Sequence, residues 1–136
     1  MNVTHRPPWL PAALLVGVAY FIIGRLSALP THHVQGWRLA AWLVSGVAYS
    51  AHIGYEQFKL KNSPRSLGLH VAVATAIGAF ALAVAGMVHS LSAASAVRPA
   101  WLLALAAWPA FTAIPAFLVA FAAGTVLVRL SRTART

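Results

Sequence analysis

The 136-residue sequence contains no cysteine. This absence excludes disulfide bonds, thiolate zinc sites, iron–sulfur clusters and covalently attached haem. The sequence also contains a single acidic residue, Glu56, against ten lysines and arginines. Enzymes that need two carboxylates are therefore excluded, and no second acid could orient a histidine beside a nucleophilic serine. Since no glycine-rich phosphate-binding motif occurs either, the sequence favours a non-enzymatic protein.

Charged residues of either sign are scarce. They make up 8% of the chain, whereas hydrophobic residues make up 60%. Soluble domains carry roughly 25% charged residues, so this chain could not cover a water-facing surface. The composition predicts an all-α integral membrane protein with one domain over residues 1–136. The net charge of +9 would indicate nucleic acid binding in a soluble protein. Here the basic residues lie between apolar runs, which predicts contact with anionic lipid headgroups and no nucleic acid partner.

Four apolar runs are long enough to cross the roughly 30 Å hydrocarbon core of a bilayer as helices. They cover residues 9–29, 37–58, 67–91 and 100–130. Ser63 followed by Pro64 is typical of a helix start, and Pro99 precedes the fourth run in the same way. The short connections between the runs predict a bundle of four antiparallel transmembrane helices.

The distribution of lysine and arginine predicts the orientation of this bundle. With four spans, both termini and the second loop lie on one side of the membrane. That side holds seven basic residues: Arg6, Lys59, Lys61, Arg65, Arg129, Arg132 and Arg135. The other side holds Arg25, Arg38 and Arg98. Because cytoplasmic loops are enriched in basic residues, we expect both termini in the cytoplasm and the protein in the cell (inner) membrane.

The only acid lies in a group of titratable residues. His52 and Glu56 are four residues apart and share a face of the second helix. His52 precedes the end of that helix by roughly 9 Å, and His70 lies at a similar depth, roughly 10 Å into the third helix. We therefore expect His52, Glu56 and His70 to form one cluster near the cytoplasmic surface, with the Tyr49 hydroxyl one turn deeper.

Small residues along both helices are expected to bring their backbones together. On the second helix they share a face with Glu56, and on the third helix they share a face with His70. They are Ala41, Ser45 and Ala48, and then Ala74, Gly78, Ala81 and Ala85.

The cluster of His52, Glu56 and His70 has either a structural role or a cofactor-binding role in the first two interpretations. Unpaired ionisable groups are costly in a membrane, so these side chains should face protein, a ligand or water. In a structural role, His52 and His70 form hydrogen bonds between helices, while Glu56 pairs with Lys59, Lys61 or Arg65. In a cofactor-binding role, His52, His70 and Tyr49 contact a haem or chlorophyll-type tetrapyrrole.

The spacing between alanine and histidine bears on this cofactor-binding role. Ala48 precedes His52 by four residues, and Ala85 precedes His89 by four. This spacing resembles the ligand motif of antenna pigment polypeptides, which implies pigment ligation by the histidine.

Two further interpretations stay open. His52, Glu56 and His70 match the ligand set of some zinc and iron sites, with the tetrapyrrole preferred over such a metal ion. The same three residues could instead relay protons during transport, which in so short a chain requires oligomerisation. We expect a non-catalytic accessory or assembly subunit of a larger membrane complex, which contacts other membrane subunits or its own copies. The alternative is a small oligomeric transporter or channel with a proton or ion site at the cluster.

Overall fold

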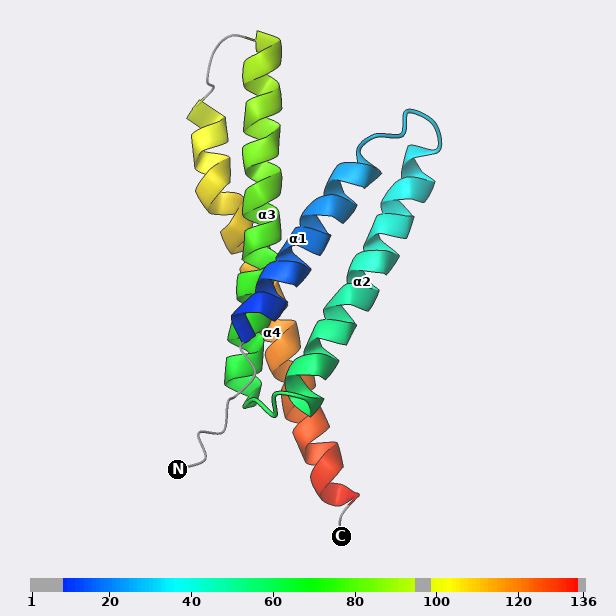
Figure 1. Ribbon diagram of the computed structural model, residues 1–136, viewed down its shortest axis with the longest axis vertical. Coiled ribbons are helices and arrows are strands. Elements are labelled where there is room, and N and C mark those ends of the chain that lie inside the picture. The colour runs from blue at the N-terminus through cyan, green and yellow to red at the C-terminus, as the bar shows by residue number, and fades with distance from the viewer. Residues whose placement is uncertain (1–8, 95–98, 135–136) are drawn as a thin grey trace.

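The computed structural model describes residues 9–94 and 99–134, and four α-helices account for most of them (Figure 1). The helices are α1 (Trp9–Ser27), α2 (Val34–Phe58), α3 (Pro64–Ala94) and α4 (Pro99–Thr133). Their ends agree with the four predicted apolar runs to within about one helical turn. The prediction of an all-helical chain with four helices is confirmed.

Three of the helices are long and apolar enough to cross a membrane: α1, α4 and, over Pro64–Ser92, α3. This result is consistent with a membrane protein. Among the described residues, α2 does not meet the same criterion, since Gln35, Arg38, His52 and Glu56 lower its mean hydropathy. The crossing by α2 and the orientation of the chain therefore stay predictions.

The start of α3 follows the predicted capping pattern. The backbone N–H of Ser66 donates a hydrogen bond to the hydroxyl oxygen of Ser63, over 3.3 Å. The N–H of Leu67 donates to the Ser63 carbonyl over 2.9 Å. Pro64 occupies the first helical position, where its missing N–H costs no hydrogen bond. This cap fixes the direction in which α3 leaves the loop after α2.

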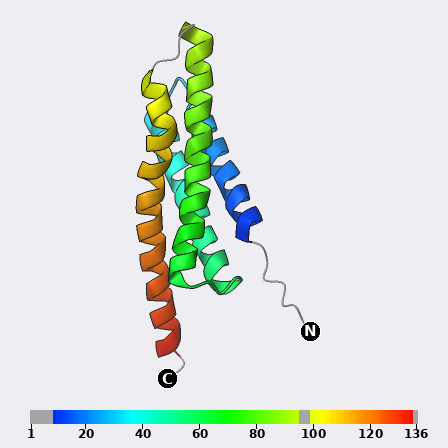
Figure 2. The same ribbon diagram turned by 90° about the vertical axis from the view of Figure 1, so that its left-hand side faces the viewer.

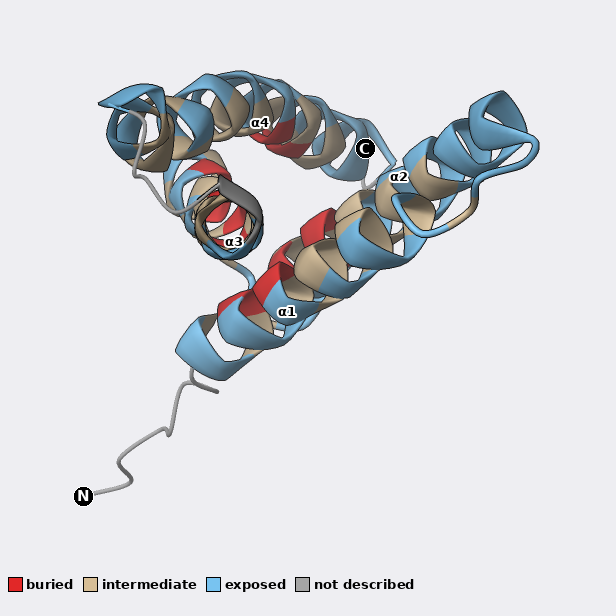
Figure 3. Cartoon of the chain, turned by 90° about the horizontal axis from the view of Figure 1, so that it is seen from above, coloured by how far each residue is buried: buried red, intermediate tan, exposed pale blue. Residues whose placement is uncertain are grey.

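The helices form two pairs that meet at one end of the molecule. The α3–α4 contact is the most extensive, and α1 packs against α3 (Figures 1 and 2). Seen from above, α1 and α2 form a row that leads away from α3 and α4 (Figure 3). The buried residues of α2 are His52, Ile53 and Glu56, all in its last two turns. Within the described residues, full burial of α2 is therefore confined to its C-terminal end.

Glycines determine how closely α1 approaches α3. A Cβ atom added to Gly78 would lie 2.7 Å from the Cβ of Tyr20 and 2.9 Å from the carbonyl oxygen of Gly17. The small face of α3 thus packs on α1. The expectation that small faces would join α2 to α3 is wrong, because helical periodicity identifies a small face without identifying the helix that covers it.

A small hydrophobic core joins α2, α3 and α4 at the end where α2 is buried. Its members are Ile53, Leu67, Val71 and Ala120, and Tyr49 packs against them. Leu67, Val71 and Ala120 are completely inaccessible to solvent. This core lies beside the predicted histidine cluster and holds the elements that carry it.

Candidate functional site

Glu56 lies at the centre of a buried polar cluster between α2, α3 and the loop that joins them. Its exposed fraction is 0%, and that of His52 is 3%. The His70 side chain is 15% exposed. The structure therefore brings together His52, Glu56 and His70, the three residues predicted to meet at this depth.

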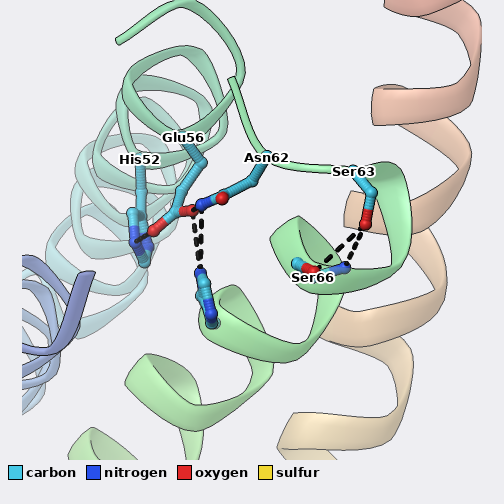
Figure 4. Close-up of polar contacts among 6 residues, drawn as sticks. His52, Glu56, Asn62, Ser63 and Ser66 are labelled. Carbon is cyan, nitrogen blue, oxygen red and sulfur yellow. Dashed lines mark hydrogen bonds and ion pairs between the residues drawn. The ribbon is translucent and has the colours of Figure 1, made fainter. Parts of the chain in front are cut away.

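One carboxylate oxygen of Glu56 has two polar partners. The Nδ1 atom of His70 lies 2.9 Å from Oε2, and the Asn62 side-chain amide donates a hydrogen bond to the same oxygen over 2.5 Å. Figure 4 shows the side chains of His52 and Asn62 converging on Glu56. Because an ionised carboxylate only accepts hydrogen bonds, Nδ1 of His70 is the donor in this arrangement. The interaction ties the end of α2 to the first turns of α3.

The other carboxylate oxygen faces His52. The Nε2 atom of His52 lies 3.6 Å from Oε1, which is within ion-pair range but too long for a hydrogen bond. Both ring nitrogens of His52 and Oε1 of Glu56 are buried without a hydrogen-bond partner. The cluster therefore has one saturated side, at Oε2, and one side with unused hydrogen-bonding capacity, at Oε1 and His52.

The charged partners available to Glu56 in the cluster are imidazole groups rather than lysine or arginine. A buried carboxylate without a compensating charge is costly, and the described ion pairs of Glu56 are both with histidines. Glu56 does not form the predicted ion pairs with Lys59, Lys61 or Arg65 within the described residues.

Two members of the site were not predicted from the sequence. Asn62 reaches Glu56 because Lys61 adopts a left-handed conformation with φ of 51°, which turns the chain back over the end of α2. The indole ring of Trp9 stacks on the His70 ring, with centroids 4.2 Å apart and planes at 2°. Trp9 begins an apolar helix and Asn62 lies in a short polar loop, and neither pattern indicates contact with a histidine.

Tyr49 lies outside the cluster. Its hydroxyl donates a 2.5 Å hydrogen bond to the carbonyl oxygen of Ala116 on α4. The tyrosine therefore joins α2 to α4, at a backbone carbonyl rather than at the histidines. The structure gives no support to its predicted place beside a cofactor.

The arrangement gives no support to a metal centre. Among the described residues, no group of three or more histidine, cysteine, aspartate or glutamate side chains is arranged to hold a metal ion. The Nδ1 atom of His70 and the Nε2 atom of His52 are directed at the two oxygens of one carboxylate, so these four atoms face one another rather than a common point. Zinc or iron ligation and tetrapyrrole ligation by these residues stay predictions.

A groove between α1 and α2 extends to His52. Its volume is about 620 Å³, and it is open along one side. Its lining residues are Pro11, Ala12, Leu15, Val16 and Ala19 from α1, and Ala48, Ala51, His52 and Tyr55 from α2. Ala48 and His52, which share the predicted alanine–histidine spacing, thus line the same groove.

Comparison with known proteins gives no family assignment: no family model, no curated protein and no solved structure matches this chain.

Proposed function

We propose that this protein is a non-catalytic accessory or assembly subunit of a larger complex in the cell (inner) membrane. Its four helices cross the membrane in antiparallel order, with both termini in the cytoplasm. The observation that carries the proposal is the exposure of α2, the helix least suited to contact lipid.

The N-terminal two-thirds of α2 has few neighbours within the chain. Every residue from Val34 to Ala40 is exposed, and Trp42 has an exposed fraction of 80%. A Cβ atom added to Gly36 or Gly46 would meet nothing within 4 Å. Small residues are typical of the faces by which membrane helices pack closely. Because α2 is less apolar than the other three helices, protein covers it better than lipid does. This supports contact between α2 and another membrane subunit.

The polar cluster has a positioning role in this proposal. It holds the C-terminal end of α2 against α3 through Glu56, His70 and Asn62. The rest of α2 is then directed away from α3 and α4, where a partner can reach it (Figure 1). The buried charges thus fix the direction in which α2 presents its exposed face.

Affinity purification from native membranes in mild detergent tests the proposal. We expect the full chain to recover membrane subunits in a fixed ratio, measured by quantitative mass spectrometry. The variant Gly46→Ile adds a branched side chain to the exposed face of α2 and should lose those subunits. The matched control is Ala106→Ile, at an exposed position of α4.

The two variants separate a loss of partner binding from a loss of stability. Neither should lower the melting temperature of the isolated chain, since Gly46 has open space around it and Ala106 is exposed. Recovery of the chain alone, or equal recovery of partners with both variants, would contradict an accessory role that depends on α2.

A second candidate function is proton-coupled transport or ion conduction by an oligomer of this chain. It is favoured by the position of Glu56, a fully buried carboxylate with one oxygen lacking a hydrogen-bond partner, between two imidazoles. Reconstituted protein should then support proton-coupled flux in liposomes that Glu56→Gln abolishes. A variant with unchanged flux would remove this candidate.

A further inference from the structure

The groove between α1 and α2 combines an apolar body with one buried, unsatisfied polar side chain. Pro11 and Ala19 mark its extent along α1, and their separation of eight residues corresponds to roughly 12 Å of helix. Its volume of about 620 Å³ is within the range of roughly 300–1,000 Å³ found for small-molecule sites. Its walls are apolar apart from His52 and Tyr55. Such a groove suits a compact, largely apolar ligand.

Four alanines give the groove flat walls. Two of them are on α1 and two on α2, at Ala12, Ala19, Ala48 and Ala51. A methyl side chain leaves the helix surface shallow, so a planar ring can lie against it, whereas larger side chains would break up that surface. The shape of the groove therefore favours an aromatic ring over a branched or globular ligand.

His52 provides the polar group that such a ring would meet. Its side chain is 1% exposed, and neither ring nitrogen has a hydrogen-bond partner. With Nε2 facing Glu56 Oε1 at 3.6 Å, the ring proton is best placed on Nε2. The Nδ1 atom is then an acceptor that lacks a donor. Burying an acceptor without a partner is costly, and a ligand hydroxyl would recover that cost.

We propose that this groove binds a neutral, lipid-soluble phenol of the hydroquinone type, whose hydroxyl group donates a hydrogen bond to His52. The ring lies against the alanine walls, and an apolar tail follows Leu15, Val16 and Ala19 along α1. Forming the new bond breaks no existing hydrogen bond, because Nδ1 has none. Glu56 acts as a positioning residue that holds the His52 tautomer.

The depth of the site suits an amphipathic molecule. His52 precedes the end of α2 by six residues, or roughly 9 Å, so it lies closer to one membrane surface than to the middle. A phenol hydroxyl placed there remains near the polar interface while its tail extends into hydrocarbon. Arrival of the ligand through the open side of the groove requires no soluble carrier.

Equilibrium binding to the purified full chain tests this inference. The probe is a hydroquinone with a decyl chain, kept reduced, and binding is measured by equilibrium dialysis in detergent micelles. We expect saturable binding of one molecule per chain. The dimethyl ether of the same probe, which has no hydroxyl, should bind at least tenfold more weakly, as should the oxidised quinone, which has no donor.

Three variants locate the site. His52→Leu removes the acceptor and should weaken binding at least tenfold. Ala51→Phe fills the groove without changing the polar cluster, and should weaken binding to the same extent. His89→Leu is the matched control at an exposed histidine of α3, and should bind as the unaltered protein does. Thermal unfolding of each variant separates a loss of binding from a loss of fold.

Several outcomes would overturn the proposal. Equal binding of the hydroquinone and its dimethyl ether would mean that the groove recognises only an apolar body. Unchanged binding in both His52→Leu and Ala51→Phe would place the ligand elsewhere. A Soret absorption band in the purified protein that disappears in His52→Leu would assign the groove to a tetrapyrrole.

Discussion

At the scale of single residues, the cluster depends on an asparagine that stands in a strained turn. Lys61 has a φ of 51°, a left-handed conformation that costs an L-residue roughly 1–2 kcal/mol. That turn lets Asn62 make two contacts with the same glutamate. Its backbone N–H donates to the Glu56 carbonyl over 3.3 Å, and its side chain donates to Oε2. Asn62 thus closes the end of α2 and stabilises a buried charge through a hydrogen bond.

A negative charge introduced at position 62 should lower the stability of the protein more than removal of the Asn62 side chain does. Asn62→Ala removes one hydrogen bond to a charged group, which should lower the free energy of unfolding by about 1.5–3 kcal/mol. Asn62→Asp puts a second carboxylate beside Glu56, so it should be more destabilising still. Reversible unfolding in detergent measures both.

A variant of the α3 N-terminal cap serves as the control for these stability measurements. Ser63→Ala removes only the capping oxygen of α3 and should cost about 1 kcal/mol. An Asn62→Asp protein no less stable than Asn62→Ala would show that Glu56 is not ionised in the folded protein.

The sequence was sufficient to predict part of this cluster. The four-residue spacing of His52 and Glu56 places them on one helical face, and the depth of His70 follows from its distance to the cap at Ser63. The contact of Asn62 depends on a left-handed lysine, and no local sequence pattern predicts that conformation at a non-glycine residue. The stacking of Trp9 on His70 depends on how α1 packs, which is a tertiary property.

At the scale of helices, the chain uses its glycines in two different ways. Gly78 is covered by Tyr20 and Gly17 of α1, whereas Gly46 faces open space on α2. Both residues lie inside helices and leave the same type of small surface. The structure thus contains a close crossing at Gly78 and an uncovered face at Gly46.

Alanine substitution at these two glycines should have opposite effects. Gly78→Ala forces a methyl group against the backbone of α1 and should destabilise the protein by about 1–3 kcal/mol. Gly46→Ala meets no neighbour and should stabilise the isolated chain by about 0.5–1 kcal/mol, because alanine favours a helix more than glycine does. Thermal unfolding of both variants in detergent measures the difference. Equal destabilisation would mean that a neighbour already covers Gly46 in the purified protein.

The helices themselves were predictable, but their neighbours were not. Long apolar runs with proline and serine at their starts define α1, α3 and α4 without reference to the rest of the chain. Gly78 of α3 packs against Gly17 of α1, and these two residues are far apart in the sequence. Helical periodicity alone would have allowed α2 to cover Gly78 equally well. The weak packing of α2 also has no local signal, since its exposed residues include Trp42, Leu43 and Val47.

At the scale of the whole molecule, the absence of cysteine allows the topology to be measured directly. Single cysteines at His32, Lys61 and Arg132 report the positions of the first loop, the second loop and the C-terminal end. In intact cells, a membrane-impermeant thiol reagent should label His32→Cys and leave Lys61→Cys and Arg132→Cys unlabelled. Lysed cells should give labelling at all three positions, which serves as the control.

This mapping decides whether α2 crosses the membrane. Labelling of His32→Cys and Lys61→Cys to the same extent in intact cells would place both ends of α2 on one side. The chain would then have three crossings, and α2 would lie along the membrane surface. The composition of α2, with Arg38 and Glu56 near its two ends, could not settle this question.

The two helix pairs converge at the Glu56 cluster and separate toward the opposite end of the molecule (Figure 1). In the membrane placement proposed above, this outline is a wedge, broader in one leaflet than in the other. Because Glu56 and His70 join α2 to α3 at the narrow end, loosening the cluster would change that taper.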